Sequence, residues 1–136
     1  MAYRASLCDP FKPEIIELGE IDRRDIIEKF KSIKWVEYLQ QMQQAEDRDI
    51  YYSPSLEIEN KENKNALSIS AVGGNEAFEF YIFYKRPKLV KKLFGLFETM
   101  NENYITEIHN QTEKDSVDCL QALIDNRIHL LETKIK

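Results

Sequence analysis

The clearest periodic pattern of the chain lies near its C-terminal end and predicts an amphipathic helix. Apolar residues recur there at intervals of three and four, the spacing that keeps side chains on one helix face. Thr112 and Asp115 stand where a capping box would begin this helix, with aspartate in place of the usual glutamate or glutamine. We therefore expect one helix of about six turns. Its apolar positions are Val117, Leu120, Ile124, Ile128, Leu131 and Ile135.

Residues 22–46 also predict helix, with Asp22 as the N-cap, but they carry two apolar stripes. A single straight amphipathic helix keeps one stripe. The segment is therefore either two short helices broken near Ser32 or one helix buried on two sides. The first stripe consists of Ile26, Phe30 and Ile33, and the second of Trp35, Leu39 and Met42.

Between these helices the apolar period changes from 3.6 to 2, which predicts strands at residues 56–59, 67–71 and 78–84. The polar run at 60–65 and the Gly73-Gly74-Asn75 sequence provide the two turns between them. Connections this short favour an antiparallel meander. The third strand is apolar on both faces from Tyr81 onward, so we expect it to be central or covered on both sides.

The remaining segments are less regular. Pro87 ends the third strand, and the apolar spacing of residues 88–97 predicts a short helix. Residues 104–108 alternate and predict a fourth strand. Pro10 and Pro13 prevent a helix near the N-terminus, so residues 1–20 are expected to form an irregular lead-in, to which Ile15, Ile16 and Leu18 could add a short edge strand.

The order α-β-β-β-α-β-α indicates the α+β fold class. We expect one domain over residues 1–136, with no internal repeat. Its architecture would be an antiparallel sheet of about four strands, with N-terminal and C-terminal helices packed mainly on one face.

Charge narrows the range of partners. The net charge is −5, which disfavours nucleic acid and anionic membrane as general partners. The middle of the chain, residues 61–97, is nevertheless basic, with seven basic and three acidic residues, and the segments around it are acidic. The chain starts without the apolar core of a signal peptide and has no stretch of 18 apolar residues. We therefore expect a cytoplasmic protein without a membrane partner.

The reactive residues form no known catalytic or metal-binding pattern. Cys8 and Cys119 are expected to be free thiols, and His109 and His129 lack the spacing of zinc ligands. The sequence contains neither a nucleophile elbow nor a phosphate-binding loop. We predict no metal, no cofactor and no enzymatic activity, although a site assembled from distant residues stays open.

A basic cluster directly follows the aromatic run at residues 80–84. Aromatic strands beside basic residues can stack on and neutralise nucleic acid, so segment 80–92 is a candidate nucleic-acid or regulatory site. The cluster would equally suit an acidic protein, or the polar side of the expected helix. Its members are Lys85, Arg86, Lys88, Lys91 and Lys92.

Several acidic residues lie near the end of the first helical segment and have the charge opposite to that of the basic cluster. Carboxylates at the C-terminal end of a helix gain nothing from its dipole, so they could instead steer a basic partner, or simply form a solvated face. Exposed tyrosines are typical of binding hot spots. The candidate partner-binding residues are Glu46, Asp47, Asp49, Tyr51, Glu57, Glu59 and Tyr81.

The chain as a whole resembles the small immunity proteins that bacteria encode beside secreted polymorphic toxins. The resemblance lies in its size, acidity and order of elements, and in segments 52–58 (YSPSLEI) and 80–87 (FYIFYKRP). It implies a cytoplasmic, non-enzymatic inhibitor that binds a cognate toxin and occludes its active site. The alternative is a nucleic-acid-binding or regulatory module that uses segment 80–92.

Overall fold

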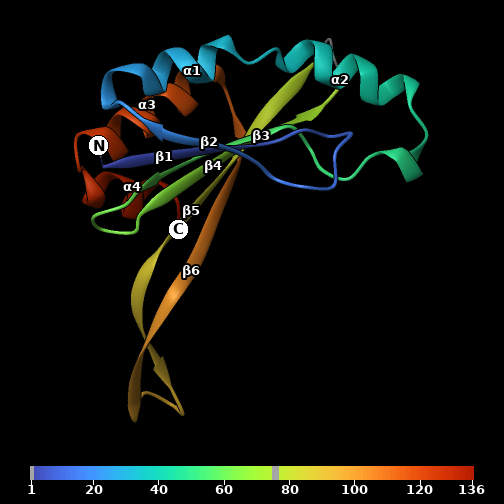
Figure 1. Cartoon of the computed structure of the whole chain (residues 1–136). Coiled ribbons are helices and arrows are strands. Elements are labelled where there is room, and N and C mark those ends of the chain that lie inside the picture. Colours follow the sequence, from blue (N-terminus) through green and yellow to red (C-terminus); the bar gives the residue numbers. More distant parts are fainter. Residues whose placement is uncertain (1, 75–76) are drawn as a thin grey trace.

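The computed structural model describes residues 2–74 and 77–136 and consists of one antiparallel sheet with helices (Figure 1). The α+β class and the antiparallel sheet are confirmed, but the expectation of about four strands is wrong, because the sheet has six in the order β2-β1-β3-β4-β5-β6. The strands are β1 (Tyr3–Cys8), β2 (Ile16–Ile21), β3 (Ser55–Asn60), β4 (Ala66–Gly73), β5 (Phe78–Lys92) and β6 (Phe97–Gln111). The α-helices are α1 (Ile26–Ser32), α2 (Trp35–Gln44), α3 (Glu113–Ile124) and α4 (Ile128–Lys134).

The two additional strands come from the N-terminal segment, so the prediction of an irregular lead-in over residues 1–20 is wrong. β1 pairs with both β3 and β2, while β2 forms an edge of the sheet as the Ile16 region suggested. Pro10 and Pro13 lie in the connection between these strands, where they interrupt no ladder. Tyr3 and Ala5 of β1 are buried in the core because β3 supplies a pairing edge that sequence periodicity does not reveal.

Residues 22–46 form two helices rather than one, and the break falls at Ile33 and Lys34. The change of direction lets both apolar stripes reach the same core. Phe30 and Trp35 lie on either side of the break, with ring centroids 5.5 Å apart, and the Trp35 Nε1 donates a hydrogen bond to the Phe30 carbonyl.

The C-terminal segment is also two helices, so the prediction of one continuous helix is wrong. The capping box of Thr112 and Asp115 is confirmed. α3 then ends in a Schellman motif: Asn126 has φ +57°, its N–H donates to Leu123, and the Arg127 N–H donates to Ala122. Asparagine tolerates this conformation better than most residues, which explains why the helix breaks there.

One set of alternating strand residues forms the core together with all four helices. From the sheet come Tyr3, Ala5, Leu56, Ile58, Leu67, Ile69, Ala71, Phe80, Ile82 and Tyr84, and from the helices Ile26, Phe30, Trp35, Leu39, Leu120, Leu123 and Leu131. The strand residues between them, such as Glu57, Ser68 and Phe83, remain only half-buried. The burial pattern therefore gives the sheet one apolar face and one mixed face.

The predicted short helix at residues 88–97 is wrong, because β5 continues through Lys92 and β6 begins at Phe97. The apolar spacing there suits a helix, but pairing with β6 decides the conformation. β6 also contains the predicted fourth strand at residues 104–108. The register shifts between Arg86 and Lys88, on either side of Pro87, which has no N–H to donate. Gly73, the last residue of β4, has φ +125°. Asn75 of the turn expected between β4 and β5 lies outside the described residues.

Candidate functional site

The outer half of the β5–β6 hairpin projects from the body of the protein, and we call residues 88–101 the ribbon. Its paired residues run from Lys88 and Asn101 to Lys92 and Phe97. Figure 1 shows the ribbon, coloured yellow and orange, leaving the sheet on the side away from α1 and α2. Two strands without a third neighbour bury little of their own side chains. The ribbon therefore presents both of its sides and its tip to the surroundings.

The tip is a tight turn that holds large apolar residues. The Leu96 N–H donates to the Leu93 carbonyl at 3.1 Å, and the two residues between them, Phe94 and Gly95, have φ of +58° and +85°. Positive φ at both central positions defines a type I′ turn, which strongly prefers Asn-Gly. Leu93 also has a positive φ, +53°. The turn geometry therefore disfavours the leucine and phenylalanine that occupy these positions with positive φ.

Six large apolar side chains of the ribbon are exposed: Leu89, Leu93, Phe94, Leu96, Phe97 and Met100. Phe94 is fully exposed and Leu96 is 78% exposed. Taken together, side chains of this size at such exposure present roughly 700 Å². This area is spread over both sides and the tip of the ribbon, whereas the largest contiguous apolar patch of an ordinary monomer measures about 300–600 Å² and is often functional. The ribbon is therefore the strongest candidate for an interaction site.

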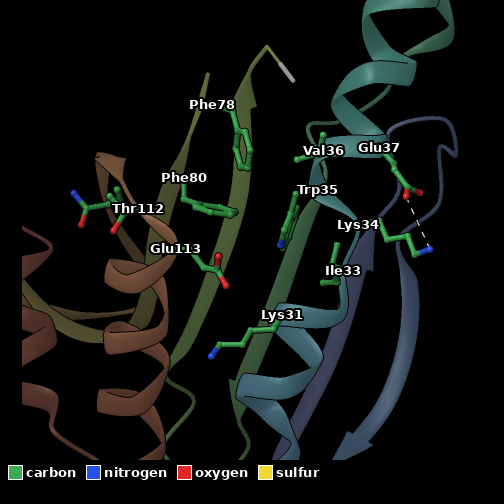
Figure 2. A pocket seen from close by; sticks show the side chains of 11 residues that line it. Lys31, Ile33, Lys34, Trp35, Val36, Glu37, Phe78, Phe80, Thr112 and Glu113 are labelled. Carbon is green, nitrogen blue, oxygen red and sulfur yellow. Dashed lines mark ion pairs between the residues drawn. The ribbon is translucent and has the colours of Figure 1, made fainter. Parts of the chain in front are cut away.

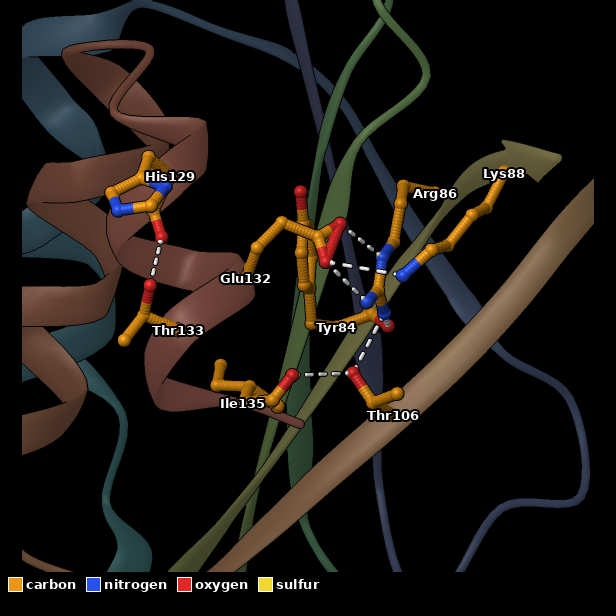
Figure 3. A network of polar contacts seen from close by, with 8 residues as sticks. All are labelled: Tyr84, Arg86, Lys88, Thr106, His129, Glu132, Thr133 and Ile135. Atoms are coloured by element: carbon orange, nitrogen blue, oxygen red, sulfur yellow. Dashed lines mark hydrogen bonds and ion pairs between the residues drawn. The ribbon is translucent and has the colours of Figure 1, made fainter. Parts of the chain in front are cut away.

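An ion-pair network holds the base of the ribbon against α4 (Figure 3). The guanidinium of Arg86 donates from Nε and Nη2 to the two carboxylate oxygens of Glu132, at 2.9 and 2.8 Å. Its Nη1 donates to the Tyr84 carbonyl and to Thr106 Oγ1. Lys88 Nζ lies 3.6 Å from the same carboxylate. The Arg86 hydrogen bonds lower the pKa of Glu132, so this carboxylate stays ionised well into the acidic range.

Aromatic rings complete this base. The Arg86 guanidinium carbon lies 4.2 Å from the ring centroid of Tyr84 and 4.7 Å from that of Tyr104, within cation–π distance of both. The Tyr84 ring is fully buried, and its hydroxyl has no hydrogen-bond partner among the described residues. Burial raises the pKa of Tyr84 to about 12. Arg86, which is only 3% exposed, is thus fixed by a carboxylate and two rings.

The structure does not bring the five basic residues of segment 80–92 together as one patch. Lys85 lies on the mixed face of the sheet, 3.4 Å from Glu57, whereas Arg86 and Lys88 face α4. Lys91 and Lys92 are exposed on the ribbon and have no ion pair among the residues that the structure describes. These two lysines are therefore the members of the cluster that remain available to a partner.

Three of the predicted partner-binding residues, Glu57, Glu59 and Tyr81, lie on the mixed face of the sheet. The Tyr81 ring stacks on His109 with centroids 3.8 Å apart, and His109 Nε2 lies 2.7 Å from Glu107 Oε2. Tyr81 and Glu57 are only half-exposed. The prediction of a central or doubly covered third strand fits the position of β5 between β4 and β6, but its Tyr81 side stays partly open.

The other four, Glu46, Asp47, Asp49 and Tyr51, lie together in the exposed segment after α2. Arg48 Nε contacts Glu46 Oε2 at 2.7 Å, which offsets part of the local charge. The Tyr51 N–H donates to the Pro10 carbonyl, so this segment is anchored beside the β1–β2 connection and not beside the ribbon. The structure therefore separates the predicted partner-binding residues into two groups.

Two of the surface pockets lie against the helices. One, of about 480 Å³, lies between the α1–α2 junction, β5 and the start of α3 (Figure 2). Trp35, Phe78 and Phe80 give it an apolar wall, and its charged residues are of both signs, with Lys34 and Glu37 4.0 Å apart. The second, of about 630 Å³, lies along α3 and α4 and includes Arg127 and His129. Neither pocket gathers charged groups of one kind.

The thiols and histidines are dispersed. Cys8 and Cys119 are free, and burial raises the pKa of Cys119 to about 11, which keeps that thiol protonated. Within residues 2–74 and 77–136, no three side chains of His, Cys, Asp or Glu converge as metal ligands. In the same part of the chain, no helix is long and apolar enough to cross a membrane.

Sequence reasoning missed the ribbon because the spacing of its apolar residues predicts a short helix over residues 88–97. A signal was present: the sequence Leu93-Phe94-Gly95-Leu96-Phe97 places large apolar residues symmetrically around a glycine, next to Lys91 and Lys92. A glycine at the centre of a short segment between two strands is typical of a hairpin turn. The exposure of the flanking residues, however, is visible only in the folded chain.

Comparisons of this chain with family models, with curated proteins and with solved structures give no match. The resemblance to immunity proteins receives no support from them and stays a prediction.

Proposed function

We propose that this chain is a non-enzymatic, protein-binding inhibitor of the immunity type, which inserts its ribbon into a cleft of a cognate toxin and occludes the active site. The observation that carries the proposal is the exposed apolar surface of the ribbon, concentrated at Leu93, Phe94, Leu96 and Phe97. A narrow element with apolar side chains on both sides and at its tip fits a cleft better than a flat surface.

The attachment of the ribbon supports this role. Arg86 and Glu132 fix its base, so less conformational entropy is lost when a partner orders the rest. Phe94 and Phe97 have the character of hot-spot residues, because truncation of a buried aromatic anchor is among the costliest changes at an interface. We expect Phe94 to contribute most, since it is the most exposed residue of the ribbon.

The acidic surface would act at longer range. Glu46, Asp47 and Asp49 are exposed and add to a chain of net charge −5, so a basic toxin would be attracted before contact. Charge reversal of these three residues is expected to slow association and to leave dissociation nearly unchanged, as rim charges usually do.

Site-specific photo-crosslinking tests the proposal. A photoreactive phenylalanine analogue in place of Phe94 is expected to crosslink one protein in cells of the source organism, whereas the same analogue at Leu130 on α4 should not. That protein should be toxic when expressed alone, and co-expression of the unchanged chain should restore growth. Restoration of growth by the Phe94→Asn chain at equal abundance would remove the ribbon from the mechanism.

The alternative, nucleic-acid binding, rests on Lys91 and Lys92, which are exposed on the ribbon near Phe94 and Phe97. Aromatic stacking next to lysines would bind single strands with strong salt dependence. Titration of the chain with a fluorescent single-stranded oligonucleotide at low salt distinguishes the two functions. Binding that is lost in the Lys91→Ala, Lys92→Ala double variant would favour the alternative.

A further inference from the structure

We infer that two copies of this chain associate through their ribbons, so that each copy covers one side of the ribbon of the other. The inference is independent of the proposed function, because it concerns the purified chain alone. It starts from exposed apolar side chains on one side of the ribbon: Leu89 and Met100 are directly paired there and are 57% and 48% exposed, next to the exposed tip. A second copy offers an equal apolar surface without any foreign partner.

One side of the ribbon carries charges that are complementary to the same side of a second copy. Leu89 pairs across the ladder with Met100, and Lys91 pairs with Glu98. Side chains alternate along a strand, and directly paired residues share a side. These four residues therefore form two rows on the same side of the ribbon, with β5 contributing the lysine and β6 the glutamate.

A two-fold axis along the ribbon would bring this side against its copy with β5 of one chain over β6 of the other. Lys91 of each copy then faces Glu98 of the other, and Leu89 faces Met100. Symmetric dimers require this kind of self-complementary surface, in which residue i contacts j and j contacts i. Neither Lys91 nor Glu98 has an ion pair within the part of the chain that the structure describes, so both can reach across the interface.

The same argument favours a copy over other occupants. A foreign protein needs an apolar cleft with matching charges, for which the chain itself offers no evidence. An anionic lipid surface would attract Lys91 and Lys92 but repel Glu98 and a chain of net charge −5. A ribbon covered by a second copy is not available to a toxin, so the two kinds of binding would exclude each other; this last consequence rests on the proposed function.

The experiment is sedimentation equilibrium of the full chain, from low-micromolar to near-millimolar concentration. We expect a reversible monomer–dimer equilibrium. Leu89→Asn removes an apolar side chain from the facing side and should raise the dissociation constant at least tenfold. Ile15→Asn, which changes an equally large exposed side chain in the β1–β2 connection, should leave the equilibrium unchanged. Circular dichroism and the thermal midpoint of each variant establish that it is folded.

Charge variants test the arrangement itself. Lys91→Glu alone places two glutamates opposite two glutamates, and Glu98→Lys alone places lysines opposite lysines, so each should be monomeric at concentrations where the unchanged chain is a dimer. An equimolar mixture of the two variants restores both contacts between chains and should form a heterodimer. Glu62→Lys, in the turn between β3 and β4, is the control for a change of net charge.

Three results would overturn the inference. A chain that remains monomeric throughout the series has no such association, and co-sedimentation of that monomer with phosphatidylglycerol-containing vesicles would assign the ribbon to a lipid surface instead. A dimer that persists unchanged in Leu89→Asn uses another surface. A mixture of Lys91→Glu and Glu98→Lys chains that stays monomeric would exclude the facing arrangement of the ribbons.

Discussion

Arg86 on β5 and Glu132 on α4 form a bidentate ion pair, with Nε–Oε1 and Nη2–Oε2 distances of 2.9 and 2.8 Å. The two residues lie 46 positions apart in the sequence, and their contact joins the last helix to the base of the ribbon. Arg86 is nearly fully buried, whereas the Glu132 side chain is 31% exposed. The ion pair therefore holds the base of the ribbon against α4. Removal of the Glu132 carboxylate would leave the buried Arg86 guanidinium without its counterion.

Glu132→Gln is expected to lower the free energy of unfolding by about 2 kcal/mol, because it leaves a buried guanidinium uncompensated while the exposure of Glu132 moderates the loss. Urea denaturation followed by circular dichroism measures the change. Asp118→Asn serves as the control, since its ion pair with Lys114 is exposed and should contribute nothing measurable. An unchanged urea midpoint in Glu132→Gln would show that the ion pair does not stabilise the fold.

The same carboxylate predicts a pH dependence. The pKa of Glu132 in the folded chain is lowered from 4.5, first by the hydrogen bonds from Arg86, so the folded state favours its ionised form. The stabilisation is fully present above the unfolded value and is lost as pH falls through the folded value. The difference in stability between the unchanged chain and Glu132→Gln should therefore shrink as pH falls below about 4.5. A difference that stays constant down to low pH would contradict this assignment.

Tyr84→Phe is expected to leave stability unchanged or raise it by about 1 kcal/mol, because it keeps the ring and removes a buried hydroxyl that has no hydrogen-bond partner among the described residues. The thermal midpoint and the urea midpoint both test this. The ring also contacts the Arg86 guanidinium, so Tyr84→Leu is the matched variant that loses this contact and should destabilise. A clear loss of stability in Tyr84→Phe would reveal a partner for the hydroxyl, such as an internal water.

Phe94→Asn is expected to raise the free energy of unfolding by about 1 kcal/mol, because asparagine tolerates the positive φ that phenylalanine adopts only under strain. The same change removes the most exposed apolar side chain of the ribbon. A variant that is more stable but binds less would indicate that the residue is retained for interaction and not for folding. Lower stability would show that Phe94 packs against the folded chain.

Cys119 is expected to resist alkylation in the native chain, because it is buried and its pKa is raised to about 11. Cys8 is only partly buried and should react faster, although burial raises its pKa too. Iodoacetamide labelling with peptide mass spectrometry, in native buffer and in urea, distinguishes the two thiols. Equal labelling of both in native buffer would contradict the burial of Cys119.

The sequence determined those elements whose signal is local. The capping box at Thr112 and Asp115 and the alternation in β3 and β4 required no knowledge of distant contacts. The two stripes of residues 22–46 required either a break or burial on two sides, and the break at Ile33 and Lys34 settled that choice. The identities of the basic and acidic residues were equally plain from the sequence.

The tertiary structure decided where pairing overrides local preference. Residues 88–97 have helical spacing but form a ribbon because β6 offers them a ladder, and β1 is a strand because β3 offers it an edge. It also decided exposure: Arg86, which belonged to a cluster of surface charges by sequence, is buried against Glu132, while Phe94 and Leu96, apolar by sequence, are exposed. Periodicity describes which residues share a face, but only the packing of distant segments determines which face is covered.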